Sequence, residues 1–174
     1  MPAGPPKFVT VPGGGSGGIA AVPSDTIVNR QHGFTLKVPE GWEPAATPAF
    51  VNSLLGDTVP AIVARVLSGK GDLIQVEISP LNGKDLKTHV DGLIAVAKKL
   101  EGAQEFELTD TKLANRPAIR RVYSTDRTGE RKTMSYYIAR QHKCIVLACQ
   151  ASKARFDQAK PAFEEAVKGF LITP

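Results

Sequence analysis

Residues 33–42 carry the pattern that decides the fold: Gly33-Phe34-Thr35-Leu36-Lys37-Val38-Pro39-Glu40-Gly41-Trp42. Every second side chain from Phe34 to Val38 is apolar, which predicts a β-strand with one buried face. Pro39 ends the strand because it has no N–H to donate to a neighbouring strand. Gly41 permits a tight bend that returns Trp42, the only tryptophan, toward the sheet. The sequence therefore predicts a strand, a bend and a tryptophan that packs against the core.

Short alternating apolar runs predict strands on both sides of this stretch, and two longer runs at helical spacing predict helices. We expect strands at residues 26–28, 61–67, 72–78, 106–113, 118–125, 133–139 and 143–150. One helix is expected from Leu86 to Leu100, with Asp85 as its N-cap. A second is expected from Phe156 to Phe170, with Pro161 opening or kinking its main segment. This order predicts an α+β fold, in which a central antiparallel sheet is flanked by helices as an α/β/α sandwich.

Residues 1–24 differ from the rest in composition, because glycine and proline supply nearly half of them. Such a segment buries too little apolar surface to offset the entropy lost on ordering, so we expect a flexible tail before one domain at residues 25–174. Within the tail, Gly13-x-Gly15-x-x-Gly18 matches a dinucleotide-binding motif and Gly14-x-Ser16-x-Gly18 matches a nucleophile elbow. Both motifs need a helix directly after them, whereas Pro23 follows within about one turn. We therefore interpret both as products of a glycine-rich linker.

The overall composition fits one soluble, folded domain. The chain has 174 residues, of which 42% are hydrophobic, enough for a sizeable core. No window approaches the roughly 18 consecutive apolar residues expected of a membrane-spanning helix. The first residues do not resemble a signal peptide. We expect a cell-envelope or periplasmic location if a leader has been removed, and a cytoplasmic one otherwise.

Three segments together resemble the PsbP/DcrB-like superfamily. They are residues 33–42 quoted above, the turn Leu113-Ala114-Asn115-Arg116-Pro117-Ala118, and the closing helix with Phe156, Pro161, Phe163 and Phe170. The superfamily includes small bacterial envelope lipoproteins, photosystem proteins of the thylakoid lumen and a Ran-binding import factor. The resemblance covers about residues 26–172 and implies a central antiparallel sheet flanked by helices. Asn115 and Arg116 stand where such turns usually carry glycine, and asparagine tolerates the left-handed conformation.

Positive charge is concentrated in the second half of the chain. The segment from Lys112 to Lys143 contains nine basic residues and only two acidic ones, Asp126 and Glu130, whereas the formal net charge of the whole chain is +5. Such a field can steer an acidic partner or an anionic surface toward one face. Charged side chains that protect an exposed hairpin from sheet-to-sheet pairing are the alternative interpretation. The residues that we assign to a basic, anion-facing patch are Arg116, Arg120, Arg121, Arg127, Arg131, Lys132, Arg140 and Lys143.

Three aromatic side chains could stack on a ligand, and two of them, the tyrosines, are near the basic residues. The candidates are Trp42, Tyr123 and Tyr137, although packing is the commoner role of a lone tryptophan after a turn. No recognised nucleic-acid motif accompanies them, so we expect no specific nucleic-acid binding and favour a protein partner.

Residues suited to catalysis or metal binding do not cluster in the sequence. His32, His89 and His142 are expected on solvated surface, and Asp85 with His89 gives only two ligands of a metal site. Cys144 and Cys149 fall on one predicted strand, about 16 Å apart and on opposite faces, which excludes a disulfide between them. We therefore expect no cofactor, no metal and no enzymatic activity.

These observations lead to an expected function. The chain is interpreted as a noncatalytic binding or accessory protein of the bacterial cell envelope, which uses its basic hairpin face to engage an acidic protein or an anionic surface. An intracellular chaperone or adaptor that binds hydrophobic segments on the sheet face is the alternative. A hydrolase or a metal-binding protein is a further, weaker one.

Overall fold

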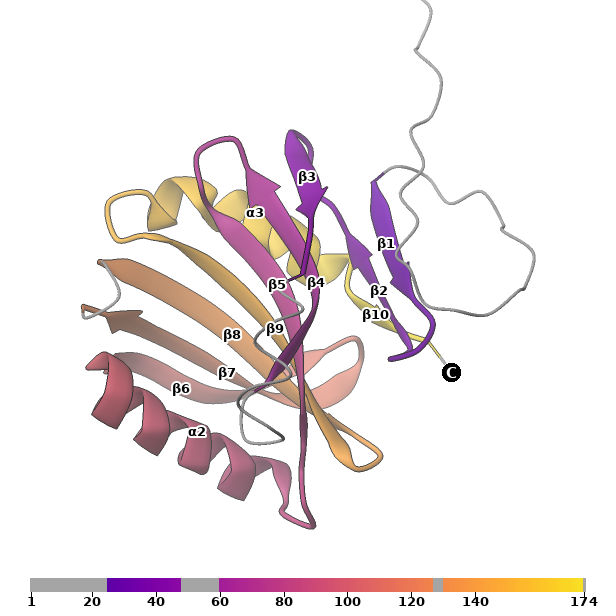
Figure 1. The fold of residues 1–174 in the computed structure, drawn as a ribbon, viewed down its shortest axis with the longest axis vertical. Helices are drawn as coiled ribbons and strands as arrows, with labels where there is room; N and C mark the ends of the chain where they lie inside the picture. Colours follow the sequence, from indigo (N-terminus) through magenta and orange to yellow (C-terminus); the bar gives the residue numbers. More distant parts are fainter. Residues whose placement is uncertain (1–24, 48–59, 127–129, 174) are drawn as a thin grey trace, which may run out of the picture.

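The computed structural model describes residues 25–47, 60–126 and 130–173, and Figure 1 shows their arrangement. Two helices, α2 and α3, and ten strands form this part of the chain. The strands are β1 (Thr26–Asn29), β2 (Phe34–Lys37), β3 (Trp42–Ala45), β4 (Ala61–Ser68), β5 (Leu73–Pro80), β6 (Gln104–Leu113), β7 (Arg116–Thr125), β8 (Arg131–Arg140), β9 (Lys143–Ser152) and β10 (Leu171–Ile172). The helices are α2 (Leu86–Glu101) and α3 (Phe156–Lys168).

The strands form two antiparallel sheets rather than one. A seven-stranded sheet has the order β3-β4-β5-β9-β8-β7-β6, and a smaller sheet has the order β1-β2-β10. The described chain is thus mostly β-sheet with two helices, and the expectation of a single flanked sheet is met only in part. β2 pairs with β1, as expected for a hairpin of these two strands. The difference arises because β2 also pairs with the C-terminal strand β10, which no local sequence pattern predicts.

Each face of the large sheet contributes to a separate hydrophobic cluster, because successive side chains of a strand point to opposite faces. On one face, Val76, Val122 and Leu147 lie in the same cluster as Phe156 and Phe163 of α3. On the other face, Ile119, Tyr137 and Val146 lie in a cluster with Val90 and Ile94 of α2. We call these the α3 face and the α2 face of the sheet.

The stretch around the tryptophan folds largely as its sequence predicts. Phe34 and Leu36 of β2 are fully buried, and Gly41 adopts a left-handed conformation with φ 76°. The backbone N–H of Trp42 donates to the carbonyl of Pro39 at 3.1 Å, which closes the bend. Trp42 then begins β3 and packs edge-on against Phe163, with ring centroids 6.0 Å apart. The bend therefore carries the chain from the small sheet to the large one.

The helices agree with the predicted pattern except at two places. The Asp85 carboxylate accepts from the backbone N–H of Thr88 at 2.9 Å, so the predicted N-cap of α2 is confirmed. Leu100, expected on the buried stripe, is 64% exposed. Pro161 lies inside α3, which begins at Phe156, so the proline does not open the helix.

Candidate functional site

Neighbouring basic residues of the predicted patch point to opposite faces of the large sheet. Arg120 and Arg121 are consecutive in β7, as Arg131 and Lys132 are in β8. Side chains alternate along a strand, so one member of each pair faces α2 and the other faces α3. A single patch built from all eight residues is therefore incompatible with the fold. Arg127 lies outside the described residues.

Arg121 is inside the molecule rather than on an anion-facing surface. Its side chain is 2% exposed and forms a bidentate ion pair with Glu105, with Nε–Oε2 and Nη2–Oε1 distances of 2.9 and 2.5 Å. Its guanidinium also stacks on the Tyr123 ring, 3.7 Å from the centroid. Such a desolvated, bidentate pair leaves no accessible charge for an outside partner. The expectation that Arg121 contacts a partner is therefore wrong.

Arg120, on the α3 face, also has an internal partner. Its Nη1 lies 2.5 Å from an Oε1 atom of Glu107, and its Nη2 contacts the Met134 sulfur at 3.6 Å. Glu105 and Glu107 both precede the basic segment in the sequence. Pairing of β6 with β7 places Glu105 opposite Tyr123 and Glu107 opposite Val122, so each glutamate is diagonal to the arginine that it binds. The hairpin therefore neutralises much of the positive charge at its centre.

Arg131 and Lys132 are the first two residues of β8, and neither forms an ion pair like those of Arg120 and Arg121 with another described residue. Arg131 donates to the side-chain oxygen of Gln150 at 3.3 Å. The ammonium of Lys132 lies 5.4 Å from the Phe106 ring and 4.7 Å from the Phe156 ring. These cation–π contacts hold Lys132 along the side of the core.

The three candidate stacking residues have their rings engaged within the protein. Trp42 packs on Phe163, and Tyr123 covers the Arg121 guanidinium. Tyr137 is 4% exposed, and burial raises the pKa of its hydroxyl. In this conformation the rings serve packing rather than ligand stacking.

Three basic residues remain at the end of the sheet where β7 begins, β8 ends and β9 begins: Arg116, Arg140 and Lys143. Arg140 pairs directly with Lys143 across β8 and β9. Ala118 pairs with Ile138, so Arg116 falls two residues further on, at the register position of Arg140. All three side chains therefore belong to the same face of adjacent strands, about 4.8 Å apart from one strand to the next. We call Arg116, Arg140 and Lys143 the cationic end.

Arg140 is fixed by backbone carbonyl groups from two distant segments. Its Nη1 donates to the carbonyls of His32 and Gly33 at 2.7 and 3.0 Å, and its Nη2 donates to that of Thr173 at 2.8 Å. It thus ties the β1–β2 turn and the end of β10 to the large sheet. Gly33 has φ 64°, and an added Cβ would lie 1.7 Å from the arginine Nη1. Only glycine fits this close approach without rearrangement.

The electrostatics at this end are one-sided. Arg116 and Lys143 are exposed, and neither they nor Arg140 form an ion pair with another described residue. Burial, and the nearby charge of Lys143, lower the pKa of His32. His32 is partly buried, which corrects the expectation that it is a solvated surface residue. Like charges in adjacent register positions repel one another, so the cationic end is a surface that an anion would stabilise.

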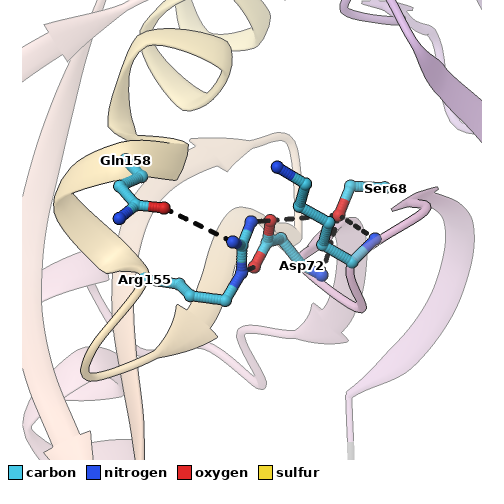
Figure 2. Close-up of polar contacts among 5 residues, drawn as sticks. Ser68, Asp72, Arg155 and Gln158 are labelled. Atoms are coloured by element: carbon cyan, nitrogen blue, oxygen red, sulfur yellow. Dashed lines mark hydrogen bonds and ion pairs between the residues drawn. The ribbon is translucent and has the colours of Figure 1, made fainter.

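The opposite end of the sheet holds a polar network, shown in Figure 2, in which both signs of charge are paired. Asp72 is buried and accepts from Arg155 at 3.2 and 2.7 Å and from the Ser68 hydroxyl at 3.0 Å. Arg155 also donates to Gln158 at 3.4 Å. A shallow hollow of about 330 Å³ beside this network is lined by Lys70, Gly71, Asp72, Glu130, Arg131, Ser152 and Arg155. Its mixed charges favour a structural link between the β4–β5 turn and α3.

The remaining candidate groups serve local structure. Asp85 caps α2, and His89 Nε2 hydrogen-bonds with the Ser79 hydroxyl at 2.9 Å. Within residues 25–47, 60–126 and 130–173, no three His, Cys, Asp or Glu side chains are grouped to hold a metal ion. Cys144 and Cys149 lie in different core clusters on opposite sheet faces, as predicted. No helix in this part of the chain is long and apolar enough to span a membrane.

The two antiparallel sheets and two helices of the described residues form a PsbP-like fold, as the similarity to solved structures shows. Cyanobacterial PsbP (CyanoP) from Synechocystis is 16% identical, with a TM-score of 0.61 over 91% of this chain and 98% of that protein. LpqN, described as involved in cell envelope biogenesis of Mycobacterium tuberculosis, is 16% identical, with a TM-score of 0.62 over 86% of this chain and 90% of that protein. PA94 from Pseudomonas aeruginosa, a protein of unknown function, is 15% identical, with a TM-score of 0.55 over 86% and 96% of the two chains. No protein-family model matches the sequence, and no curated protein does.

Proposed function

We propose that this chain is a noncatalytic binding or accessory protein of the bacterial cell envelope, and that its cationic end engages an acidic protein partner. The fold neighbours include an envelope-biogenesis protein and a PsbP protein, which supports an accessory role. The observation that carries the proposal is the row formed by Arg116, Arg140 and Lys143. Charge of one sign, held at a fixed end of a rigid sheet, increases the rate at which oppositely charged partners associate.

The position of this row also distinguishes it from the rest of the basic segment. Arg120 and Arg121, in the middle of β7, are neutralised by ion pairs with Glu107 and Glu105. Arg116 and Lys143, at the end of the sheet, are exposed. Arg140 supplies charge and holds the neighbouring turn. We therefore expect a partner that recognises this protein by charge to bind at the cationic end.

An affinity capture from the source cells tests this function. The variant Arg116→Glu/Lys143→Glu reverses the two exposed charges of the cationic end. Lys98→Glu/Lys160→Glu makes the same change of net charge at exposed positions on α2 and α3, and serves as the matched control. We expect the first variant to lose its acidic partners and the control to keep them, with both folded by circular dichroism. Retention of the same partners by both variants would refute the proposal.

A second candidate function has one specific observation in its favour. β6 ends the large sheet on one side, and its Phe106 and Leu108 are 55% and 49% exposed. An extended apolar segment could add to such an edge as a further strand, which corresponds to the chaperone or adaptor alternative. Binding of an unfolded apolar peptide that is abolished by Leu108→Lys and unaffected by Arg116→Glu/Lys143→Glu would favour this second function.

A further inference from the structure

The cationic end is extended by a turn from the other sheet. Residues 30–33 connect β1 and β2, and Arg30 is exposed within this connection. The Asn29 side chain accepts from the backbone N–H of His32 at 3.0 Å, which stiffens the turn. Arg140 then fixes the turn to the large sheet through the carbonyls of His32 and Gly33. A cation that is remote in the sequence is thereby carried to the same corner of the molecule.

We propose that Arg30, Arg116 and Lys143 together form a recognition site for an acidic peptide segment, with Arg140 as the residue that positions Arg30. This inference rests on the proposed function and adds the recognised chemistry and the contribution of the β1–β2 turn. The three exposed cations come from the β1–β2 turn and from the first residues of β7 and β9, and the guanidinium of Arg140 is bonded to three carbonyls at this end.

The spacing of these cations favours an extended, multivalent ligand. Arg116 and Lys143 lie two strands apart, which corresponds to about 10 Å at the usual strand spacing. Carboxylates three residues apart in a polyproline II segment lie on the same side of the chain and span about the same distance, at about 3.1 Å per residue. The guanidinium of Arg30 and that of Arg116 can each hold a carboxylate with two parallel hydrogen bonds. One acidic segment can therefore contact two or three of the cations at once.

The surroundings favour a peptide over a membrane surface. Of the five large hydrophobic side chains that are exposed in the described residues, four belong to α2 and to the first half of β6: Val96, Leu100, Phe106 and Leu108. The fifth, Leu171, lies in β10, two residues before Thr173. Gln104 pairs with Ser124, so β6 begins at the end of the sheet opposite the cationic end. The four apolar side chains of α2 and β6 are consequently not placed to enter a bilayer alongside Arg30, Arg116 and Lys143, and Leu171 is a single apolar side chain rather than a patch.

The test uses the full chain and a hexaglutamate peptide, with binding followed by amide chemical shifts in NMR spectra at low salt. We expect shifts at residues 30–33, 116 and 141–143, and an affinity about tenfold lower for Arg30→Glu. Lys98→Glu, with the same change of charge on α2, should lower the affinity by less than about twofold. Inorganic phosphate and vesicles containing phosphatidylglycerol are compared under the same conditions. Stronger, Arg30-dependent binding to the vesicles would overturn the assignment of a peptide ligand.

The positioning role of Arg140 has its own readout. Arg140→Lys retains the charge but cannot bridge three carbonyls with a planar fork. We expect faster amide hydrogen exchange in residues 30–33 and a severalfold lower affinity for hexaglutamate at unchanged net charge. Equal exchange and equal affinity would show that Arg140 does not position the turn.

The outcomes separate this inference from the broader function. If Arg116→Glu/Lys143→Glu abolishes partner capture while Arg30→Glu has wild-type affinity for hexaglutamate, the contribution of the turn is refuted and the proposed function stands. If no variant changes either measurement, both are refuted.

Discussion

The pKa of an individual side chain in this protein depends on its burial and on the groups that surround it. Glu77 lies on β5, and burial raises the pKa of its carboxyl, although the Gln75 side chain donates to it at 2.5 Å. A raised pKa means that the folded state holds the proton more tightly than the unfolded state does. The stability contributed by this proton is present below the unfolded pKa, about 4.3, and is lost as the pH rises through the folded pKa.

The variant Glu77→Gln tests this linkage. We expect it to unfold at a higher urea concentration than the wild type at pH 7, because no buried charge has to form. The difference in unfolding free energy between the two proteins should shrink as the pH falls toward 4. A difference that stays constant from pH 4 to pH 8 would contradict the raised pKa.

The two cysteines provide a second prediction at the level of residues. Both thiols are fully buried, and burial raises the pKa of Cys144 to about 12 and that of Cys149 further. Thiolate is the reactive form, so both should react slowly with a disulfide reagent in the folded protein at pH 8 and rapidly in urea. The rate at which the reagent dithionitrobenzoate releases its coloured nitrothiobenzoate anion checks this. Rapid labelling of either thiol without denaturant would contradict the burial described.

At the scale of secondary structure, the network in Figure 2 joins the β4–β5 turn to the start of α3. Burial raises the pKa of Asp72, but hydrogen bonds from Arg155 and Ser68 outweigh this effect, and the pKa is lowered. Its contribution to stability is therefore present above the unfolded pKa, about 3.9, and is lost as the pH falls through the lower folded value.

The substitution Asp72→Asn should lower the unfolding free energy by about 1–3 kcal/mol at pH 7, because it leaves the Arg155 guanidinium without its counter-charge. Urea titration of the single variants and of Asp72→Asn/Arg155→Gln completes a double-mutant cycle. We expect the double variant to lose less than the sum of the two single losses. Additive losses would show that the two side chains act independently.

The elements of the fold were largely predictable from local patterns. The Asp85 cap, the alternation through Phe34 and the bend at Gly41 depend on neighbours in the sequence, and all three were predicted. The pairing of β2 with β10 brings together residues more than a hundred positions apart, so no local pattern indicates it. The strand at Trp42 was missed because four residues containing a proline carry little periodicity.

At the scale of the whole molecule, the sequence located an excess of positive charge but could not show how much of it remains accessible. Glu105 and Glu107 lie before the basic segment, and only the register of β6 against β7 places them diagonal to Arg121 and Arg120, within ion-pair distance. The alternation of Arg120 and Arg121 was predictable from strand geometry. The fixation of Arg140 by carbonyls of the other sheet was not, since it depends on how the two sheets meet.

The most direct test of the central claim is site-specific photo-cross-linking in the source cells. A photoreactive residue is placed at His142, an exposed position in the turn between Arg140 and Lys143, or at Lys160 on α3 as the control. If the cationic end binds an acidic protein, adducts with that protein form from position 142 and disappear with Arg116→Glu/Lys143→Glu, and none form from position 160. Adducts from position 160 alone, or adducts from position 142 that survive the charge reversal, would contradict it.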